Sequence, residues 1–116
     1  MAAFDDPALA ITPAEAARRQ AEGELVIVDV REQYEWDAGH VPGARHVEIE
    51  RIASRADTLD RGRPVAFVCR LGTRAGMVAH AFRAIGYDAY AIAGGFTAWH
   101  AQGLPVEPDG ATVAPH

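Results

Sequence analysis

One cysteine stands at the start of a short loop whose composition suits thiol chemistry. Cys69 follows an apolar run, and residues 69–74 read Cys-Arg-Leu-Gly-Thr-Arg. Arg70 and Arg74 bring two positive charges, and Gly72 permits a tight turn into a helix that we predict to begin near Arg74. Backbone N–H groups, the positive end of a helix dipole and arginines all favour the thiolate over the thiol. The loop therefore predicts a nucleophilic Cys69 in a cradle that can also hold an anion.

Two other interpretations of this cysteine stay open at the level of the loop alone. Cysteine is among the residue types most often buried, so a lone cysteine that ends a strand can be structural. A cysteine followed five residues later by an arginine also fits a cysteine-dependent phosphatase or arsenate reductase. The glycine, the arginine at position 74 and the helix start together favour a functional cysteine.

The composition excludes several other chemistries. All 11 basic residues are arginine, so lysine Schiff-base chemistry, a lysine-containing P-loop and a Ser-Lys dyad are excluded. Ser54 is the only serine and does not lie in a G-x-S-x-G elbow. A single cysteine forms no internal disulfide or multi-cysteine zinc site, and the five histidines are scattered, so we expect no metal and no cofactor. A net charge of -5 argues against nucleic acid as a partner.

The elements that must position Cys69 alternate between strand and helix. Continuous apolar runs, typical of strands that are buried on both faces, end near Asp29 and at Cys69. Such alternation predicts an α/β fold with a small, open, mostly parallel sheet and helices on both faces. The strands are expected at 25–30, 45–47, 65–69 and 89–92, and the helices at 12–21, 32–38, 49–59, 74–85 and 94–99.

The length of 116 residues suits one domain, which we assign to residues 1–106. Residues 107–116 carry Pro108, Gly110 and Pro115, and we expect them to form a disordered C-terminal tail. The longest apolar runs fall far short of the roughly 20 residues that span a bilayer, so no membrane contact is expected. The first residues lack the features of a secretory signal, and a cytoplasmic location is therefore expected.

Two charged residues at the end of strand 25–30 are further candidates. Asp29 and Arg31 would lie near Cys69 if the two strands are parallel neighbours. They either support the loop or form a structural ion pair. Trp36 and Trp99 are predicted to be core anchors, because aromatic side chains with helical neighbours are usually buried.

Three segments of the chain resemble the rhodanese-like single-domain sulfurtransferases, the thiosulfate sulfurtransferase family. The match covers roughly residues 11–106 and carries its motifs in the family's order and spacing. The matching motifs are Val28-Asp29-Val30-Arg31-Glu32 with Glu35-Trp36 and Gly39-His40-Val41-Pro42-Gly43-Ala44, then Cys69-Arg70-Leu71-Gly72-Thr73-Arg74, and finally Gly94-Gly95-Phe96 with Trp99 and Gly103-Leu104-Pro105-Val106.

The resemblance implies a rhodanese-like fold and an enzyme that carries a sulfane sulfur on Cys69 as a persulfide. The donor would be a small anion such as thiosulfate, and the acceptor would be cyanide, a thiol or a sulfur-accepting protein. The substrate-binding residues would be Arg70, Leu71, Gly72, Thr73 and Arg74. The alternative within the family is a non-catalytic binding or regulatory module, against which the intact Cys69 argues.

Overall fold

Two apolar runs form the centre of a parallel sheet. The computed structural model describes residues 7–116, and within them five strands are ordered β1-β5-β4-β2-β3. Every pair of neighbouring strands is parallel, so the expected α/β fold with an open sheet is confirmed. The strands are β1 (Ala10–Ile11), β2 (Val26–Asp29), β3 (Arg45–His46), β4 (Val65–Val68) and β5 (Ala89–Ile92).

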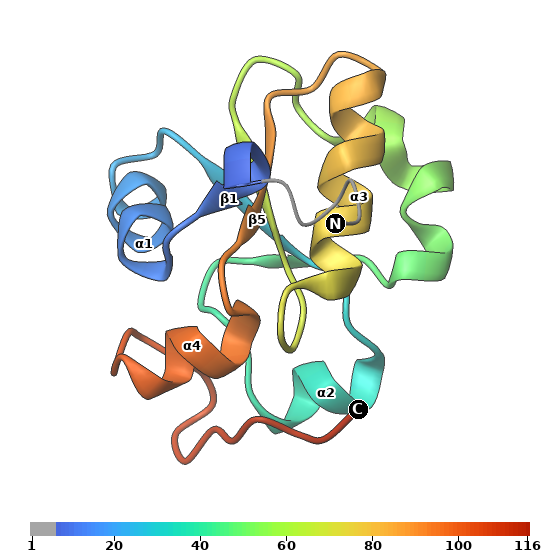
Figure 1. Ribbon diagram of the computed structural model, residues 1–116. Helices are drawn as coiled ribbons and strands as arrows, with labels where there is room; N and C mark the ends of the chain where they lie inside the picture. Colours follow the sequence, from blue (N-terminus) through green and yellow to red (C-terminus); the bar gives the residue numbers. More distant parts are fainter. Residues whose placement is uncertain (1–6) are drawn as a thin grey trace.

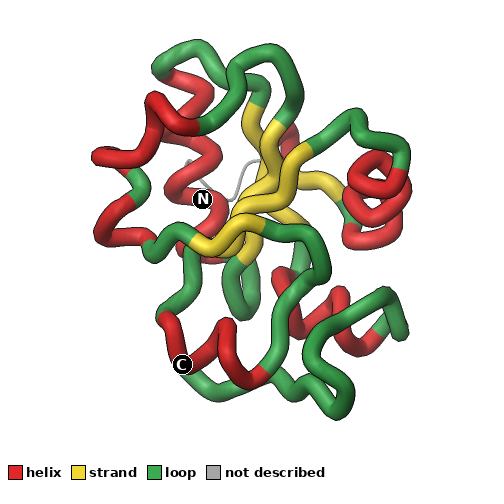
Figure 2. Tube along the Cα trace, turned by 180° about the vertical axis from the view of Figure 1, so that it is seen from behind, coloured by secondary structure: helices red, strands yellow, loops and turns green. Residues whose placement is uncertain are grey.

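Helices cover both faces of the sheet (Figures 1 and 2). One face packs against α1 and α4, and the other against α3 and two short 3-10 helices that replace the helix expected at 49–59. Among the described residues, no helix is long and apolar enough to cross a membrane. The helical elements are η2 (Pro7–Leu9), α1 (Pro13–Ala21), α2 (Gln33–Ala38), η3 (Ile49–Arg51), η4 (Ala53–Thr58), α3 (Thr73–Ala84) and α4 (Gly95–Ala101).

The side chains of β4 alternate between two apolar cores. Phe67 points to the α3 side, where its ring lies 5.0 Å from that of Phe82, and Val68 packs on the α1 and α4 side. Trp99 is buried in this second core, as predicted. Trp36 differs from the prediction, because it is only half-buried and stacks on His40 with ring centroids 3.7 Å apart.

The starts of α1 and α2 carry local capping contacts. Thr12 caps α1, because its Oγ1 accepts the N–H of Glu15 at 3.1 Å. The Glu15 side chain does not close a capping box but pairs with Arg18 at 2.7 Å. The capping box occurs instead at α2, between Glu32 and Glu35.

Residues 107–116, for which the composition predicts disorder, pack along α2 in the structure. Glu107 and His40 exchange backbone hydrogen bonds of 2.8 and 2.9 Å in an antiparallel bridge. Farther along, the N–H of Thr112 donates to the Ala38 carbonyl at 2.9 Å, and Ala111 is buried. Val113 also packs against the core on the α1 and α4 side, so backbone hydrogen bonds and a few apolar contacts, which composition does not reveal, hold the segment in place.

Candidate active site

The carboxyl end of β4 delivers Cys69 into a cradle of backbone N–H groups. Its Sγ accepts hydrogen bonds from the N–H of Gly72 at 3.1 Å and from that of Ala75 at 3.3 Å. Gly72 precedes the first residue of α3 with a left-handed φ of 114°, which lets the chain turn around the sulfur. Two N–H groups and the positive end of a twelve-residue helix thus stabilise negative charge on Sγ.

The first turn of α4 holds the other side of this loop. The N–H of Phe96 donates to the Cys69 carbonyl at 2.8 Å, and Thr97 donates its N–H and its hydroxyl to the Arg70 carbonyl at 3.1 and 2.9 Å. Figure 1 shows the loop after β4 descending between α4 and α2. The first turn of α4 therefore fixes the loop backbone, which orients its N–H groups toward the sulfur.

Arg74 forms an ion pair inside the protein. Its guanidinium makes two hydrogen bonds, of 2.9 and 3.0 Å, to the two carboxylate oxygens of Glu35. Burial raises the pKa of Glu35, but the hydrogen bonds from Arg74 and from the Glu32 backbone, with the Arg74 charge, lower it below its usual value. The hydrogen bonds to Glu35 raise the pKa of Arg74, and the charges of Glu35 and Cys69 add to that rise. Arg74 thus links α2 to the loop and keeps a positive charge near the sulfur.

A small cavity opens over the sulfur. It measures about 110 Å³ and is lined by loop residues and by one residue from the other end of the chain. At about 30 Å³ of liquid volume per water molecule, it has room for roughly four waters or one small anion. The Arg70 guanidinium makes no hydrogen bond or ion pair to any described residue, and so remains available to an anion in the cavity. The lining residues are Cys69, Arg70, Leu71, Thr73, Arg74 and His116.

Asp29 and Arg31 form a fully buried ion pair beneath the site. The guanidinium of Arg31 contacts both carboxylate oxygens of Asp29, the closest at 2.8 Å, and donates to the Gly39 carbonyl at 2.7 Å. Its third nitrogen, Nη1, has no hydrogen-bond partner among the described residues, but the guanidinium carbon lies 4.5 Å from the ring centre of Phe96. Arg31 therefore reaches the loop through Phe96, whose N–H holds the Cys69 carbonyl.

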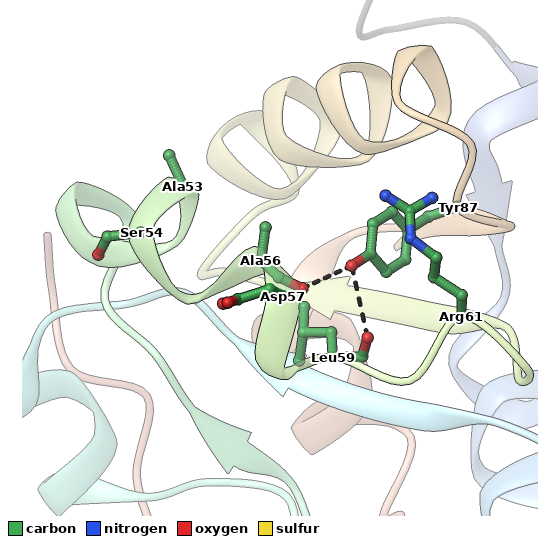
Figure 3. Close-up of a pocket in the computed structure, with 7 residues that line it drawn as sticks. All are labelled: Ala53, Ser54, Ala56, Asp57, Leu59, Arg61 and Tyr87. Carbon is green, nitrogen blue, oxygen red and sulfur yellow. Dashed lines mark hydrogen bonds between the residues drawn. The ribbon is translucent and has the colours of Figure 1, made fainter.

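A larger depression of about 510 Å³ lies near the amino ends of the strands, away from Cys69 (Figure 3). The Tyr87 hydroxyl at its base donates to the carbonyls of Ala56 and Leu59. Arg61 lies over the Tyr87 ring and donates to the Ile85 carbonyl at 2.7 Å. These polar groups already have partners, so the cavity over Cys69 is the better candidate for chemistry.

A protein-family comparison places these features in a known context. The family model described as "Rhodanese-like domain" matches residues 12–102, from the cap of α1 to the end of α4. The chain belongs to the rhodanese-like domain family. This confirms the resemblance seen in the sequence.

Relatives of this rhodanese-like domain include whole proteins and parts of longer ones. A Bacillus subtilis protein named "Putative sulfurtransferase YtwF" is 33% identical over 74% of this chain and 84% of its own length. An HTH-type transcriptional regulator of Mycobacterium tuberculosis is 38% identical over 92% of this chain, which spans only 48% of that regulator. The crystal structure of a rhodanese-related protein from Thermoplasma volcanium superposes with a TM-score of 0.79 at 22% identity, covering 84% of this chain and 96% of that one. The family match and the Bacillus subtilis relative support a sulfurtransferase-type fold, whereas the Thermoplasma volcanium structure supports the fold alone.

The structure also places residues in the rhodanese-like site to which sequence reasoning gave no role. Glu35 belongs to a matching motif, but only the fold brings it to Arg74, 39 positions away. The N–H of Ala75, one residue beyond the predicted loop, contacts the sulfur. His116 lies at the cavity, although its sequence neighbourhood carries no signal for this. The oxygens of Glu32 and Glu35 and a nitrogen of His116 lie within 4.8 Å of one another, but Arg74 already engages both oxygens of Glu35.

Proposed function

We propose that this domain is a sulfurtransferase whose Cys69 carries a sulfane sulfur, as a persulfide, from a small anionic donor such as thiosulfate to a thiophilic acceptor. The observation that carries the proposal is the Sγ atom of Cys69, which accepts two backbone N–H groups at the base of a small cavity. The unpaired guanidinium of Arg70 at the same cavity supports an anionic donor. The family match supports the type of reaction.

In the loading step, the Cys69 thiolate attacks the outer sulfur of thiosulfate. A sulfur–sulfur bond forms on Cys69, the sulfur–sulfur bond of thiosulfate breaks, and its electron pair leaves with sulfite. Total charge is conserved, since a thiolate and a dianion become a persulfide anion and a dianion. The N–H groups of Gly72 and Ala75 can stabilise the thiolate, while Arg70 offsets the charge of the donor.

In the discharge step, the acceptor attacks the terminal sulfur of the persulfide. Cyanide forms a carbon–sulfur bond to give thiocyanate, and the electron pair of the broken sulfur–sulfur bond returns to Cys69 as the thiolate. A thiolate acceptor reacts in the same way and leaves as a persulfide. Neither step needs a metal, an organic cofactor or an external oxidant.

The test is an intact-mass measurement after treatment with thiosulfate, followed by addition of cyanide. We expect the wild-type protein to gain the mass of one sulfur atom and to lose it again as thiocyanate appears over repeated cycles. Cys69→Ala is the matched control and should neither gain a sulfur atom nor form thiocyanate. A wild-type protein that gains no sulfur from thiosulfate or from another sulfane donor would overturn the proposal.

The same preparations distinguish the rival cysteine chemistry. The loop from Cys69 to Arg74 is short, and its N–H groups suit one sulfur atom better than a phosphoryl group with three oxygens. We therefore expect no hydrolysis of p-nitrophenyl phosphate by the wild-type protein beyond that of Cys69→Ala. Phosphatase turnover that depends on Cys69, without sulfur transfer, would favour a phosphatase.

A second candidate function is that of a regulatory module, favoured by the relative named as an HTH-type transcriptional regulator. Such a module would not turn over sulfur even if Cys69 accepted it. The number of thiocyanate molecules released per protein therefore separates the two functions.

Replacement of Arg70 is expected to weaken use of the donor. With Arg74 held by Glu35, Arg70 is the arginine at the cavity that has no ion-pair partner among residues 7–116, and Arg70→Ala should raise the KM for thiosulfate. One charge-assisted hydrogen bond predicts a rise of at least about tenfold. Arg70→Lys should recover part of this loss, because lysine keeps the charge but not the planar fork. Arg55→Ala, a change of an exposed arginine on η4, is the control. Steady-state kinetics in which both alanine variants keep the wild-type KM would contradict the role of Arg70.

A further inference from the structure

The cavity over Cys69 has one wall that does not come from the loop. His116 lines it together with the loop residues, although it lies 47 positions away from the cysteine in the sequence. Its Nε2 lies 3.2 Å from a carboxylate oxygen of Glu32, the residue that caps α2. The charge of His116 also contributes to lowering the pKa of Glu35, which places it close to the Glu35–Arg74 pair. His116 thus stands beside the reacting group.

The segment that leads to His116 is anchored along the whole length of α2. At one end, Thr112 donates its N–H to the Ala38 carbonyl at 2.9 Å, and near the other end the Tyr34 hydroxyl donates to the Pro115 carbonyl at 3.0 Å. Figure 1 shows the red segment following α2 and ending beside its first turn. Because α2 also carries Glu35, one short helix positions both Arg74 and this wall.

Residues 111 and 112 pack tightly against the end of α2. Gly39, at the end of α2, has no room for a side chain, because a Cβ there would lie 2.7 Å from the carbonyl oxygen of Thr112 and 2.8 Å from the Cβ of Ala111. The Nε2 atom of His100 also lies 3.0 Å from the carbonyl oxygen of Ala111. The segment that leads to His116 therefore has a defined position against α2.

We propose that His116, held by the segment 111–115 that packs along α2, forms a specificity-determining wall and restricts which acceptors reach the sulfur on Cys69. The inference rests on the proposed function. Cys69 is buried, so its persulfide is reached through the cavity of about 110 Å³. Diatomic cyanide fits beside His116, whereas a thiol on a larger molecule must displace the imidazole before its sulfur comes into line.

The experiment measures discharge of a preloaded persulfide by a small and by a large acceptor. The protein is loaded with thiosulfate, freed of sulfite, and mixed with cyanide or with the tripeptide thiol glutathione while the protein mass is followed. In His116→Ala we expect the rate with glutathione, relative to cyanide, to rise by at least about tenfold, a typical effect of relieving a steric mismatch in a pocket. Tyr34→Phe, which removes an anchor outside the cavity, should shift the ratio in the same direction by less.

The control is His80→Ala, because His80 is an exposed histidine on α3. His80→Ala should leave the ratio of the glutathione rate to the cyanide rate at the wild-type value. A ratio that stays at the wild-type value in His116→Ala, with the persulfide formed normally, would overturn this inference and leave the proposed function intact. A wild-type protein that forms no persulfide would overturn both.

Discussion

The Arg74→Ala variant is expected to lose about 3 to 5 kcal/mol of unfolding free energy, because it leaves a carboxylate buried without its partner. Glu35 is fully buried, and both of its oxygens are bound by Arg74. The N–H of Glu32 remains as a single donor to this carboxylate. Denaturant unfolding of the two proteins at pH 7 measures the difference. Arg18→Ala, which removes two exposed ion pairs of α1, with Glu15 and Glu22, is the control and should cost much less, because water screens those pairs.

The pH dependence of this difference separates the ion pair from a loss of packing. The pKa of Glu35 is lowered in the folded wild-type protein, so its stabilising contribution is present above the unfolded value of about 4.3 and is lost as the pH falls below it. In Arg74→Ala only burial acts strongly on Glu35, which raises its pKa, so the variant gains stability relative to wild type as Glu35 takes up a proton. The difference in unfolding free energy should therefore shrink between pH 7 and pH 4. A difference that stays constant with pH would point to lost packing instead.

The second large effect is expected at a glycine that touches the catalytic loop. Gly95 has a left-handed φ of 62°, and a Cβ there would overlap the Cys69 carbonyl oxygen and lie 2.5 Å from that of Arg70. Both oxygens belong to backbone that α4 holds by hydrogen bonds, so neither can move without displacing the loop. Gly95→Ala should therefore cost about 2 to 5 kcal/mol, the sum of a left-handed alanine and an overpacked contact.

Sulfur transfer should suffer even where Gly95→Ala still folds. A displacement of the loop by about 1 Å can lower a rate by roughly 100-fold, because the N–H groups no longer point at the sulfur. Gly103→Ala is the matched control: its φ is 70°, but a Cβ there meets no atom of the described residues within 4 Å. Thermal unfolding and thiocyanate formation should both separate the two variants. Equal unfolding temperatures and equal rates of thiocyanate formation in the two variants would show that the close approach of Gly95 to the loop is unimportant.

The sequence predicts those parts of the molecule that are encoded locally. The apolar runs that end at Asp29 and Cys69 identify the two central strands, and the glycine before α3 places the start of that helix within a residue. The edge strand β1 has only two residues and no pattern of its own; its strand character comes from pairing with β5. Short edge strands of this kind depend on tertiary structure, which overrides local preference.

The same distinction applies to the candidate site: features encoded by neighbouring residues could be predicted, and contacts between distant residues could not. The thiol cradle follows from consecutive residues, so the position of Cys69 and the loop after it could be predicted. The partner of Arg74 could not, because an arginine beside a cysteine suits an anionic ligand and a buried glutamate equally well. Glu35 reaches Arg74 only because α2 lies beyond the carboxyl end of the sheet. His116 was missed for the same reason, since backbone contacts with α2 bring it to the cavity.

The order of the strands has a consequence for how the chain folds during its synthesis. Ala10, near the start of the described residues, pairs in register with Ala91 of β5, so β1 has no place in the sheet until residues 89–92 have left the ribosome. Until then, β4 has one edge without hydrogen-bonding partners, because β5 is its neighbour on that side. An unpaired apolar strand edge is a template for pairing with another chain. Nascent copies on a crowded polysome are therefore prone to associate in the interval between synthesis of β4 and of β5.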